Sequence, residues 1–234
     1  MPHRSPRSST AGKQQHLSKR RHLLRALGAG LLLAAWFLAL MFYKDLSYHA
    51  SDPVEPPQQE AQVLVVYFSR SGHTEAASRQ IARQLNADIV QLRAPAYAQT
   101  YSGFRRASKD AKAKVSAPIS PQRLDLSKYR LVVLGSPIWW YRPAPPLWAF
   151  AEANEFRGAA VVLFNTFNSR FKREEIDAFR ALVERQGGRF LDHIYVRRGR
   201  IYWQLSGAEV LRQVEIQVAE KSPGWLSVHY GEGR

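Results

Sequence analysis

The segment Val63-Leu64-Val65-Val66-Tyr67-Phe68-Ser69-Arg70-Ser71-Gly72-His73-Thr74-Glu75 decides the fold of this 234-residue chain. Its first six residues are apolar and rich in β-branched side chains, which predicts a buried parallel strand. A polar loop follows, and the loop leads into a helical pattern over Thr74–Leu85. Backbone N–H groups and the positive end of a helix dipole converge at such a junction. The segment therefore predicts an anion-binding loop that suits a phosphate.

The loop offers neutral donors to that phosphate. Ser69, Ser71 and Thr74 carry hydroxyl groups, and Gly72 allows a positive φ or a close backbone approach. The loop has no lysine and lacks the spacing of a Walker loop or a dinucleotide fingerprint. These features favour a phosphomonoester that is held in place over a phosphate that is transferred. The alternative is an ordinary strand-to-helix turn with a Ser or Thr cap.

Strands and helices are expected to alternate after this segment. Four further strands are predicted at Asp88–Leu92, Tyr129–Gly135, Ala159–Phe164 and Phe190–Val196. Helices are predicted at about Pro146–Glu152, Glu174–Gln186 and Gly207–Lys221, and the long connection Ala94–Gln122 is expected to be partly helical. Five strands that alternate with helices predict an α/β fold in which helices cover both faces of a parallel sheet.

Ligands of such sheets bind at the carboxyl ends of the strands. Three predicted strands end in unusual polar or aromatic loops, at Ser69–Thr74, Gly135–Arg142 and Asn165–Arg170. The second loop has two adjacent tryptophans that can flank a flat ring, and the third has amide and backbone groups for a ring edge. Together the three loops predict a site for a planar, phosphorylated aromatic molecule.

Two of these loops resemble those of the flavodoxins. Tyr67–Thr74 is similar to the flavodoxin phosphate loop, and Leu134–Trp140, with Pro146 and the helix after it, is similar to the second flavin loop. The resemblance extends from about Ala61 to Lys221. It implies a flavodoxin-like fold with five parallel strands in the order 2-1-3-4-5, and FMN bound without a covalent link.

The resemblance also implies a role for each loop. The residues that would hold the FMN phosphate are Ser69, Arg70, Ser71, Gly72, His73 and Thr74. Those that would contact the isoalloxazine ring are Pro137, Ile138, Trp139 and Trp140, with one tryptophan stacking on the ring or covering its edge, and Ser136 before them would also bind the cofactor. The third loop would contribute Asn165, Thr166 and Phe167, although the glycine-rich turn of the family is missing there.

Composition narrows the chemistry further. The chain has no cysteine, which excludes disulfides, thiolate metal sites and cysteine nucleophiles. Its seven histidines lack the helical pair spacing of a zinc enzyme, and no basic aromatic motif of an RNA-binding sheet is present. We therefore expect no metal and no nucleic-acid partner, and we expect the chemistry to come from the cofactor.

The N-terminal region predicts a membrane segment. The net charge is +15, of which residues 1–25 carry +7 without an acid, and the remainder of the chain carries +8. Residues 26–43 have no charge and would form a helix about 27 Å long, close to the thickness of the hydrocarbon core. The positive-inside rule then places residues 1–25 in the cytoplasm and the later residues outside, at the inner membrane facing the periplasm. Expected boundaries are a basic region at 1–25, the membrane helix at 26–43, a Pro-rich linker at 44–61, the FMN-binding domain at 62–222 and a tail at 223–234.

The residues that precede this helix resemble a twin-arginine signal. Lys19-Arg20-Arg21-His22-Leu23-Leu24-Arg25 contains paired arginines, two apolar residues and a base. The resemblance implies export of an already folded protein with its cofactor loaded. An ordinary anchor and a cleaved signal peptide are the alternatives, and an uncleaved anchor is favoured.

The expected function is that of an exported, membrane-anchored flavoprotein that carries electrons to a redox partner protein or a membrane quinone. A flavodoxin-like NAD(P)H:quinone oxidoreductase is the alternative, and a flavin-free binding module is a third. The basic stretch Arg105–Lys114 predicts a solvated helical face. If it binds a partner, an acidic protein or anionic lipid would suit its charge.

Overall fold

The computed structural model describes residues 9–46, 60–200 and 203–227. The chain divides into two compact units, Met1–Ser47 and Tyr48–Arg234. Most of the predicted linker at 44–61 and residues 228–234 of the predicted tail lie outside the described residues.

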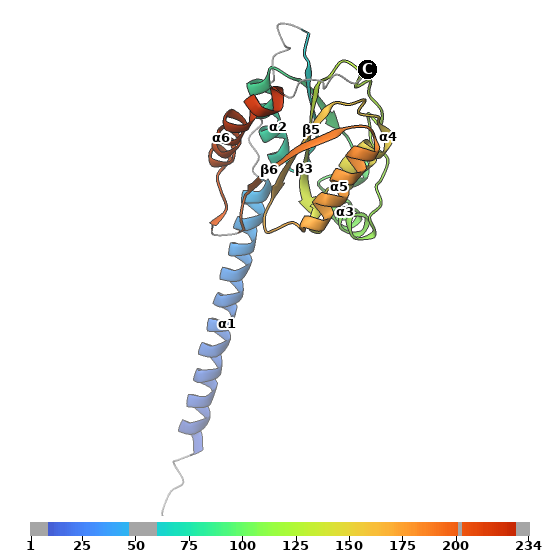
Figure 1. Ribbon diagram of the computed structural model, residues 1–234. Helices are drawn as coiled ribbons and strands as arrows, with labels where there is room; N and C mark the ends of the chain where they lie inside the picture. The colour runs from blue at the N-terminus through green and yellow to red at the C-terminus, as the bar shows by residue number, and fades with distance from the viewer. Residues whose placement is uncertain (1–8, 47–59, 201–202, 228–234) are drawn as a thin grey trace, which may run out of the picture. The chain divides into compact units, whose positions relative to one another are not determined.

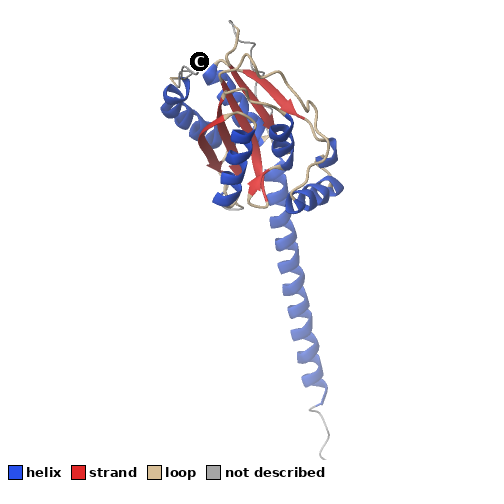
Figure 2. Cartoon of the chain, turned by 45° about the vertical axis from the view of Figure 1, so that its right-hand side comes forward, coloured by secondary structure: helices blue, strands red, loops and turns tan. Residues whose placement is uncertain are grey.

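The second unit is built on one sheet. Its parallel strands are β1 (Val63–Phe68), β2 (Asp88–Leu92), β3 (Leu131–Trp139), β5 (Ala160–Phe167) and β6 (Arg189–Arg197), in the order β2-β1-β3-β5-β6. The two-residue strand β4 (Arg142–Pro143) pairs antiparallel with the end of β3. Figure 2 shows these strands in red between the helices. Counted along the parallel strands, the observed order is the predicted 2-1-3-4-5.

Helices cover both faces of the sheet. Figure 1 shows α2 (His73–Leu85) and α6 (Gly207–Leu226) on one face, and α3 (Tyr101–Ala113), α4 (Pro145–Ala153) and α5 (Arg173–Arg185) on the other. A short 3₁₀ helix, η1 (Pro95–Tyr97), lies between β2 and α3. The expectation that the connection Ala94–Gln122 is partly helical is therefore confirmed.

Side-chain periodicity explains this layering. In β1, Leu64, Val66 and Phe68 belong to the core on the α3–α5 side, whereas Val63 and Val65 belong to the core under α2 and α6. Successive side chains of a strand point to opposite faces, and β1 is apolar at every position because both faces are covered. The helices bury only one stripe each, as α2 does with residues 77, 81 and 85.

Three predicted boundaries are wrong by several residues. β3 continues four residues past Gly135, because Ile138 and Trp139 pair with β4 in a hairpin. β5 continues past Phe164 to Phe167, because β3 and β6 are long enough to pair with it on both sides. α6 continues past Lys221 to Leu226, and Trp225 is 6% exposed in its last turn.

The first unit contains α1 (Ser9–Leu46), which includes the predicted membrane helix. Within it, Lys19–Leu40 is a 22-residue segment that is long and apolar enough to cross a membrane, and none of it is buried in the structure. A signal sequence near an N-terminus has the same length and composition as this segment.

Candidate functional site

The three predicted loops meet at one edge of the sheet. β1 and β3 are neighbours with Tyr67 opposite Gly135, and β3 and β5 are neighbours with Ser136 opposite Asn165. The carboxyl ends of β1, β3 and β5 therefore lie side by side, and the residues that the sequence analysis assigned to a ligand lie in or directly after these ends.

The loop after β1 leads into a helix N-terminus that no side chain caps. Gly72 is the N-cap of α2 with φ 85°, a left-handed conformation that favours glycine, and no side chain caps the helix. The Gly72 N–H donates to Ser69 Oγ at 3.1 Å, which closes the turn and leaves the Ser69 hydroxyl hydrogen available to another acceptor. Because helix N–H groups in the first turn lack intrahelical partners, this geometry fits a bound phosphate.

Thr74 connects this loop to β5. Its side chain is buried, and the hydroxyl oxygens of Thr74 and Thr166 lie 2.8 Å apart. One hydroxyl donates and the other accepts, so each retains some capacity for a further hydrogen bond. The contact fixes the first turn of α2 against the end of β5.

The predicted second loop is a tight hairpin between β3 and β4. Trp140 and Tyr141 are its two turn residues, with φ of 49° and 69°. Two-residue hairpins with positive φ at both positions usually contain Asn and Gly, because bulky residues are strained in this region. Strain of this kind costs of the order of 1–3 kcal/mol per residue and is concentrated at functional sites. The hairpin therefore places two aromatic residues at the carboxyl edge of the sheet in a backbone conformation that is unfavourable for them.

The adjacent tryptophans have different environments. The Trp139 ring packs edge-on against Phe68 and Tyr97, with ring centroids 5.4 and 5.6 Å apart. The Trp140 side chain is 48% exposed, and its Nε1 donates to Ser108 Oγ of α3 at 2.8 Å. Trp139 thus belongs to the packing under the hairpin, whereas about half of the Trp140 side chain is open to solvent.

The predicted third loop is the buried end of β5. Asn165 is 0% exposed, and its Nδ2 donates to the backbone carbonyl of Ser136 at 2.9 Å and to Ser136 Oγ at 3.2 Å. His193 Nε2 of β6 lies 3.0 Å from Asn165 Oδ1. Because Asn165 Nδ2 is the donor on one side, Oδ1 accepts on the other, and His193 carries its proton on Nε2. Asn165 therefore joins β3, β5 and β6.

Comparison with known proteins agrees with this arrangement. The sequence pattern of the flavodoxin family matches residues 62–197. The chain belongs to the flavodoxin family. No curated protein matches it in sequence.

Two solved structures resemble the flavodoxin fold of this chain. A flavoprotein from Lactobacillus acidophilus NCFM, in complex with FMN, is 18% identical over 58% of this chain and 93% of its own, with a TM-score of 0.50. A protein from Bacteroides uniformis ATCC 8492 that is described as a flavoprotein is 19% identical over 67% of this chain and 99% of its own, with a TM-score of 0.53. At these identities the likeness establishes a shared fold.

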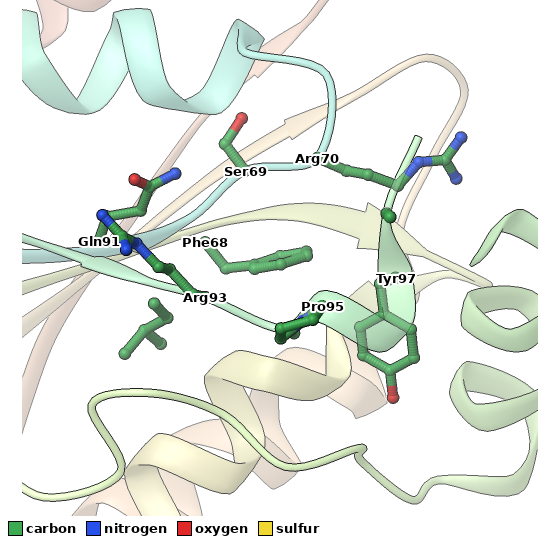
Figure 3. A pocket seen from close by; sticks show the side chains of 10 residues that line it. Phe68, Ser69, Arg70, Gln91, Arg93, Pro95 and Tyr97 are labelled. Carbon is green, nitrogen blue, oxygen red and sulfur yellow. The ribbon is translucent and has the colours of Figure 1, made fainter. Parts of the chain in front are cut away.

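A shallow pocket of about 200 Å³ lies on the β2 side of the phosphate loop. Phe68, Ser69, Arg93 and Tyr97 are among its lining residues, which come from the ends of β1 and β2 and from η1. Figure 3 shows the Arg70 and Arg93 side chains leaving this pocket in opposite directions, so their guanidinium groups do not converge on one point. The pocket borders the loop but is not lined by Trp140 or by residues of β5.

His193 is a neutral member of the flavodoxin framework. Burial lowers its pKa to about 4, and the nearby Asp192 carboxylate opposes this effect only in part. Its ring lies 5.0 Å from that of Phe171 and 5.4 Å from that of Tyr195. The neutral form agrees with a hydrogen bond that His193 donates to Asn165.

Several contacts of the site were not expected from the sequence. The Tyr141 ring lies 5.3 Å from the Arg170 guanidinium carbon and 5.7 Å from Lys172 Nζ, and the Tyr141 carbonyl accepts from the Lys172 N–H at 2.9 Å. The Lys112 Nζ of α3 lies 3.8 Å from the Trp140 ring centroid. The hairpin is therefore held between α3 and the loop before α5. The unusual density of aromatic and basic residues in these segments was the only sequence signal for these contacts.

Proposed function

We propose that this protein is a membrane-anchored flavodoxin-like redox protein that binds FMN without a covalent link. The observation that carries the proposal is the uncapped N-terminus of α2 behind a left-handed Gly72, one strand away from a hairpin with an exposed Trp140. Membership of the flavodoxin family and the FMN in the related Lactobacillus acidophilus structure support it. Bound FMN would supply the redox chemistry, since the ring accepts and releases electrons.

The residues present fit this cofactor. The phosphate would accept hydrogen bonds from the first N–H groups of α2 and from the Ser69 hydroxyl, and no lysine is needed because FMN is held and not cleaved. Trp140 would cover a face or an edge of the isoalloxazine ring. Asn165 and Thr166 would act mainly by fixing the strand ends, because their side chains already bond within the framework.

The central test is a visible spectrum of a fragment that begins at Glu60. We expect absorbance bands of oxidised flavin, and release of FMN when the fragment is denatured. A colourless fragment that does not take up added FMN would contradict the proposal and favour the flavin-free binding module.

The electron donor and acceptor need a second experiment on the same sample. Adding NADH, NADPH or a quinone under anaerobic conditions distinguishes a carrier from an NAD(P)H:quinone oxidoreductase. For a carrier we expect the flavin spectrum to change slowly with the nicotinamides and to respond to a reduced quinone or a protein donor. Rapid bleaching by NADH or NADPH would contradict the carrier assignment.

We also propose that the chain is exported through its N-terminal region and stays anchored, with residues 1–25 in the cytoplasm and the flavin domain on the periplasmic side of the inner membrane. The 22-residue apolar segment and the charges before it support this topology. Changing Arg20 and Arg21 to lysine keeps the charge but removes the twin-arginine pair. We expect export to stop. Unchanged export would contradict the twin-arginine assignment, while the anchor itself would remain.

A further inference from the structure

A basic aromatic face covers the outward side of α3 and the tip of the β3–β4 hairpin. It consists of Tyr101, Phe104, Arg105, Lys109, Lys112 and Trp140. The aromatic side chains are 77% exposed at Tyr101, 54% at Phe104 and 48% at Trp140. Clusters of exposed apolar side chains on a folded domain mark interaction surfaces.

The face is continuous with the proposed flavin site. Trp140 bonds to Ser108 of α3, and Lys112 lies 3.8 Å from the Trp140 ring centroid. At the other end of the helix, the Arg70 guanidinium carbon lies 5.3 Å from the Phe104 ring centroid. One side of α3 therefore extends from the phosphate loop to the hairpin that would cover the ring.

The exposed charges of this face are all positive. α3 has four lysines or arginines and a single acid, Asp110, which is 3% exposed and bonds to Tyr97 and Arg106. By contrast, α5 and α6 each have more acids than bases. An α-helix has 3.6 residues per turn, so residues 101, 105, 109 and 112 lie on one side of α3. Arg105, Lys109 and Lys112 are therefore exposed on the same side as Tyr101.

We propose that the basic aromatic face docks on a membrane surface that contains anionic phospholipid. Clusters of lysine and arginine close to a membrane segment are attracted to anionic phospholipid headgroups. Tyrosine and tryptophan prefer the depth of the headgroups, where their polar atoms stay hydrated. Docking would bring Trp140 and the flavin ring that it covers to the bilayer surface, where a membrane quinone is reached. The inference rests on the proposed membrane anchor of residues 26–43.

The length of the tether favours lipid over an acidic protein as the partner. Sixteen residues separate Leu46 from Val63 and span at most roughly 55 Å when extended. Any face of the domain can then reach the bilayer, and the tether keeps the local concentration of lipid high. An acidic protein would use the same charges, but it would have to find this face without a tether.

The test uses the full chain in lipid nanodiscs. Because the chain has no cysteine, Ser102→Cys places one fluorescent label on the exposed side of α3, and Ile216→Cys places the same label on α6. Brominated lipids in the disc quench a label that touches the bilayer. With phosphatidylglycerol in the discs and low salt, we expect at least about threefold more quenching at position 102 than at position 216. The two positions should become equal in phosphatidylcholine discs or at about 0.5 M salt.

Charge reversal supplies the matched variants. Arg105→Glu with Lys109→Glu should remove the difference between the labels, because it reverses the charge of the face without touching the hairpin. Arg83→Glu with Arg212→Glu makes the same charge change on the α2–α6 side and should leave the difference intact.

The outcomes separate this proposal from the anchor on which it rests. If the chain does not elute with the discs, the membrane anchor fails and the docking proposal fails with it, while the visible spectrum still reports the flavin. If the chain elutes with the discs but both labels are quenched equally, the anchor holds and the docking proposal is overturned. An acidic protein partner then becomes the better explanation of the face.

Discussion

At the scale of single residues, we expect Trp139 to contribute to stability and Trp140 to FMN binding. Trp139 packs against Phe68 and Tyr97, whereas Trp140 is 48% exposed. We expect Trp139→Ala to lower the free energy of unfolding by about 3 kcal/mol, since it leaves a cavity beneath the hairpin. Trp140→Ala should change that free energy by less than about 1 kcal/mol but raise the Kd of FMN roughly tenfold, through the loss of aromatic stacking.

Chemical denaturation and flavin fluorescence titration measure these two quantities on the same variants. If Trp139→Ala weakens FMN binding without destabilising the fold, Trp139 and not Trp140 is the tryptophan that contacts the flavin. Trp203→Phe is a suitable control, because Trp203 is 43% exposed and contacts Arg197 of β6.

The lowered pKa of His193 predicts that the stability of the fold depends on pH. Its pKa falls from 6.5 to about 4 in the folded protein, chiefly because partial burial of the ring disfavours its charged form. Between these values the unfolded chain binds more protons at this residue than the native protein, so its contribution to stability rises with pH. That contribution is complete above pH 6.5 and is lost as the pH falls toward 4, by up to about 3 kcal/mol.

The measurement compares wild type with His193→Gln, whose amide can still donate to Asn165. Denaturation at several values between pH 4 and pH 7 should show a steeper loss of stability in the wild type. The neighbouring charges on Asp192, Arg173, Lys221 and Arg180 remain in both proteins and cancel in the comparison. Parallel pH profiles would show that His193 is not the titrating group.

At the scale of elements, the position of α3 depends on a buried carboxylate. Asp110 accepts from the Tyr97 hydroxyl at 2.9 Å and from Arg106 Nε at 2.6 Å, and Tyr97 in turn accepts from the Ala117 N–H at 2.7 Å. We expect Asp110→Ala to lower the free energy of unfolding by about 2–4 kcal/mol, because buried partners lose their hydrogen bonds.

The exposed Asp177→Ala of α5 is the control and should stay within about 0.5 kcal/mol. Hydrogen exchange would show whether the Asp110 variant loosens α3 first. A variant as stable as the control would mean that the apolar contacts of η1 and α3 suffice to hold the helix.

The sequence predicted some of these elements and missed others. The layering and the loop at Ser69–Thr74 follow from local periodicity and from one motif, and the strand order was implied by the resemblance to the flavodoxins, so these features were predictable. The hairpin at Trp140 and Tyr141 was not, because positive φ at two aromatic residues opposes local preference and is set by contacts with α3 and Lys172. Gly103 was also not recognised: a Cβ there would lie 2.1 Å from the Ala98 carbonyl oxygen, which fixes how closely α3 approaches η1.

For the whole molecule, the apolar helix and the candidate flavin site lie in different units. Every residue assigned to the flavin lies in the unit Tyr48–Arg234, and the apolar helix lies in the unit Met1–Ser47. In the proposed docking, the basic aromatic face of the second unit would depend on the first unit for its nearness to lipid. Anchoring and cofactor binding should therefore respond independently to mutation, whereas lipid docking should require both units.

Thermal unfolding with added FMN tests that independence. A ligand at a hundred times its Kd stabilises the native state by about 2.7 kcal/mol, which corresponds to a rise in Tm of roughly 5–10 °C for a domain of this size. We expect the same rise for a fragment that begins at Glu60 and for the full chain in detergent, because both contain the complete site. Ser69→Ala with Gly72→Ala should reduce the rise in both, since a methyl group at a φ of 85° strains the loop and one hydroxyl donor is lost. A rise in the full chain but not in the fragment would mean that residues before Glu60 contribute to the flavin site, and the separation of the two units would then be wrong.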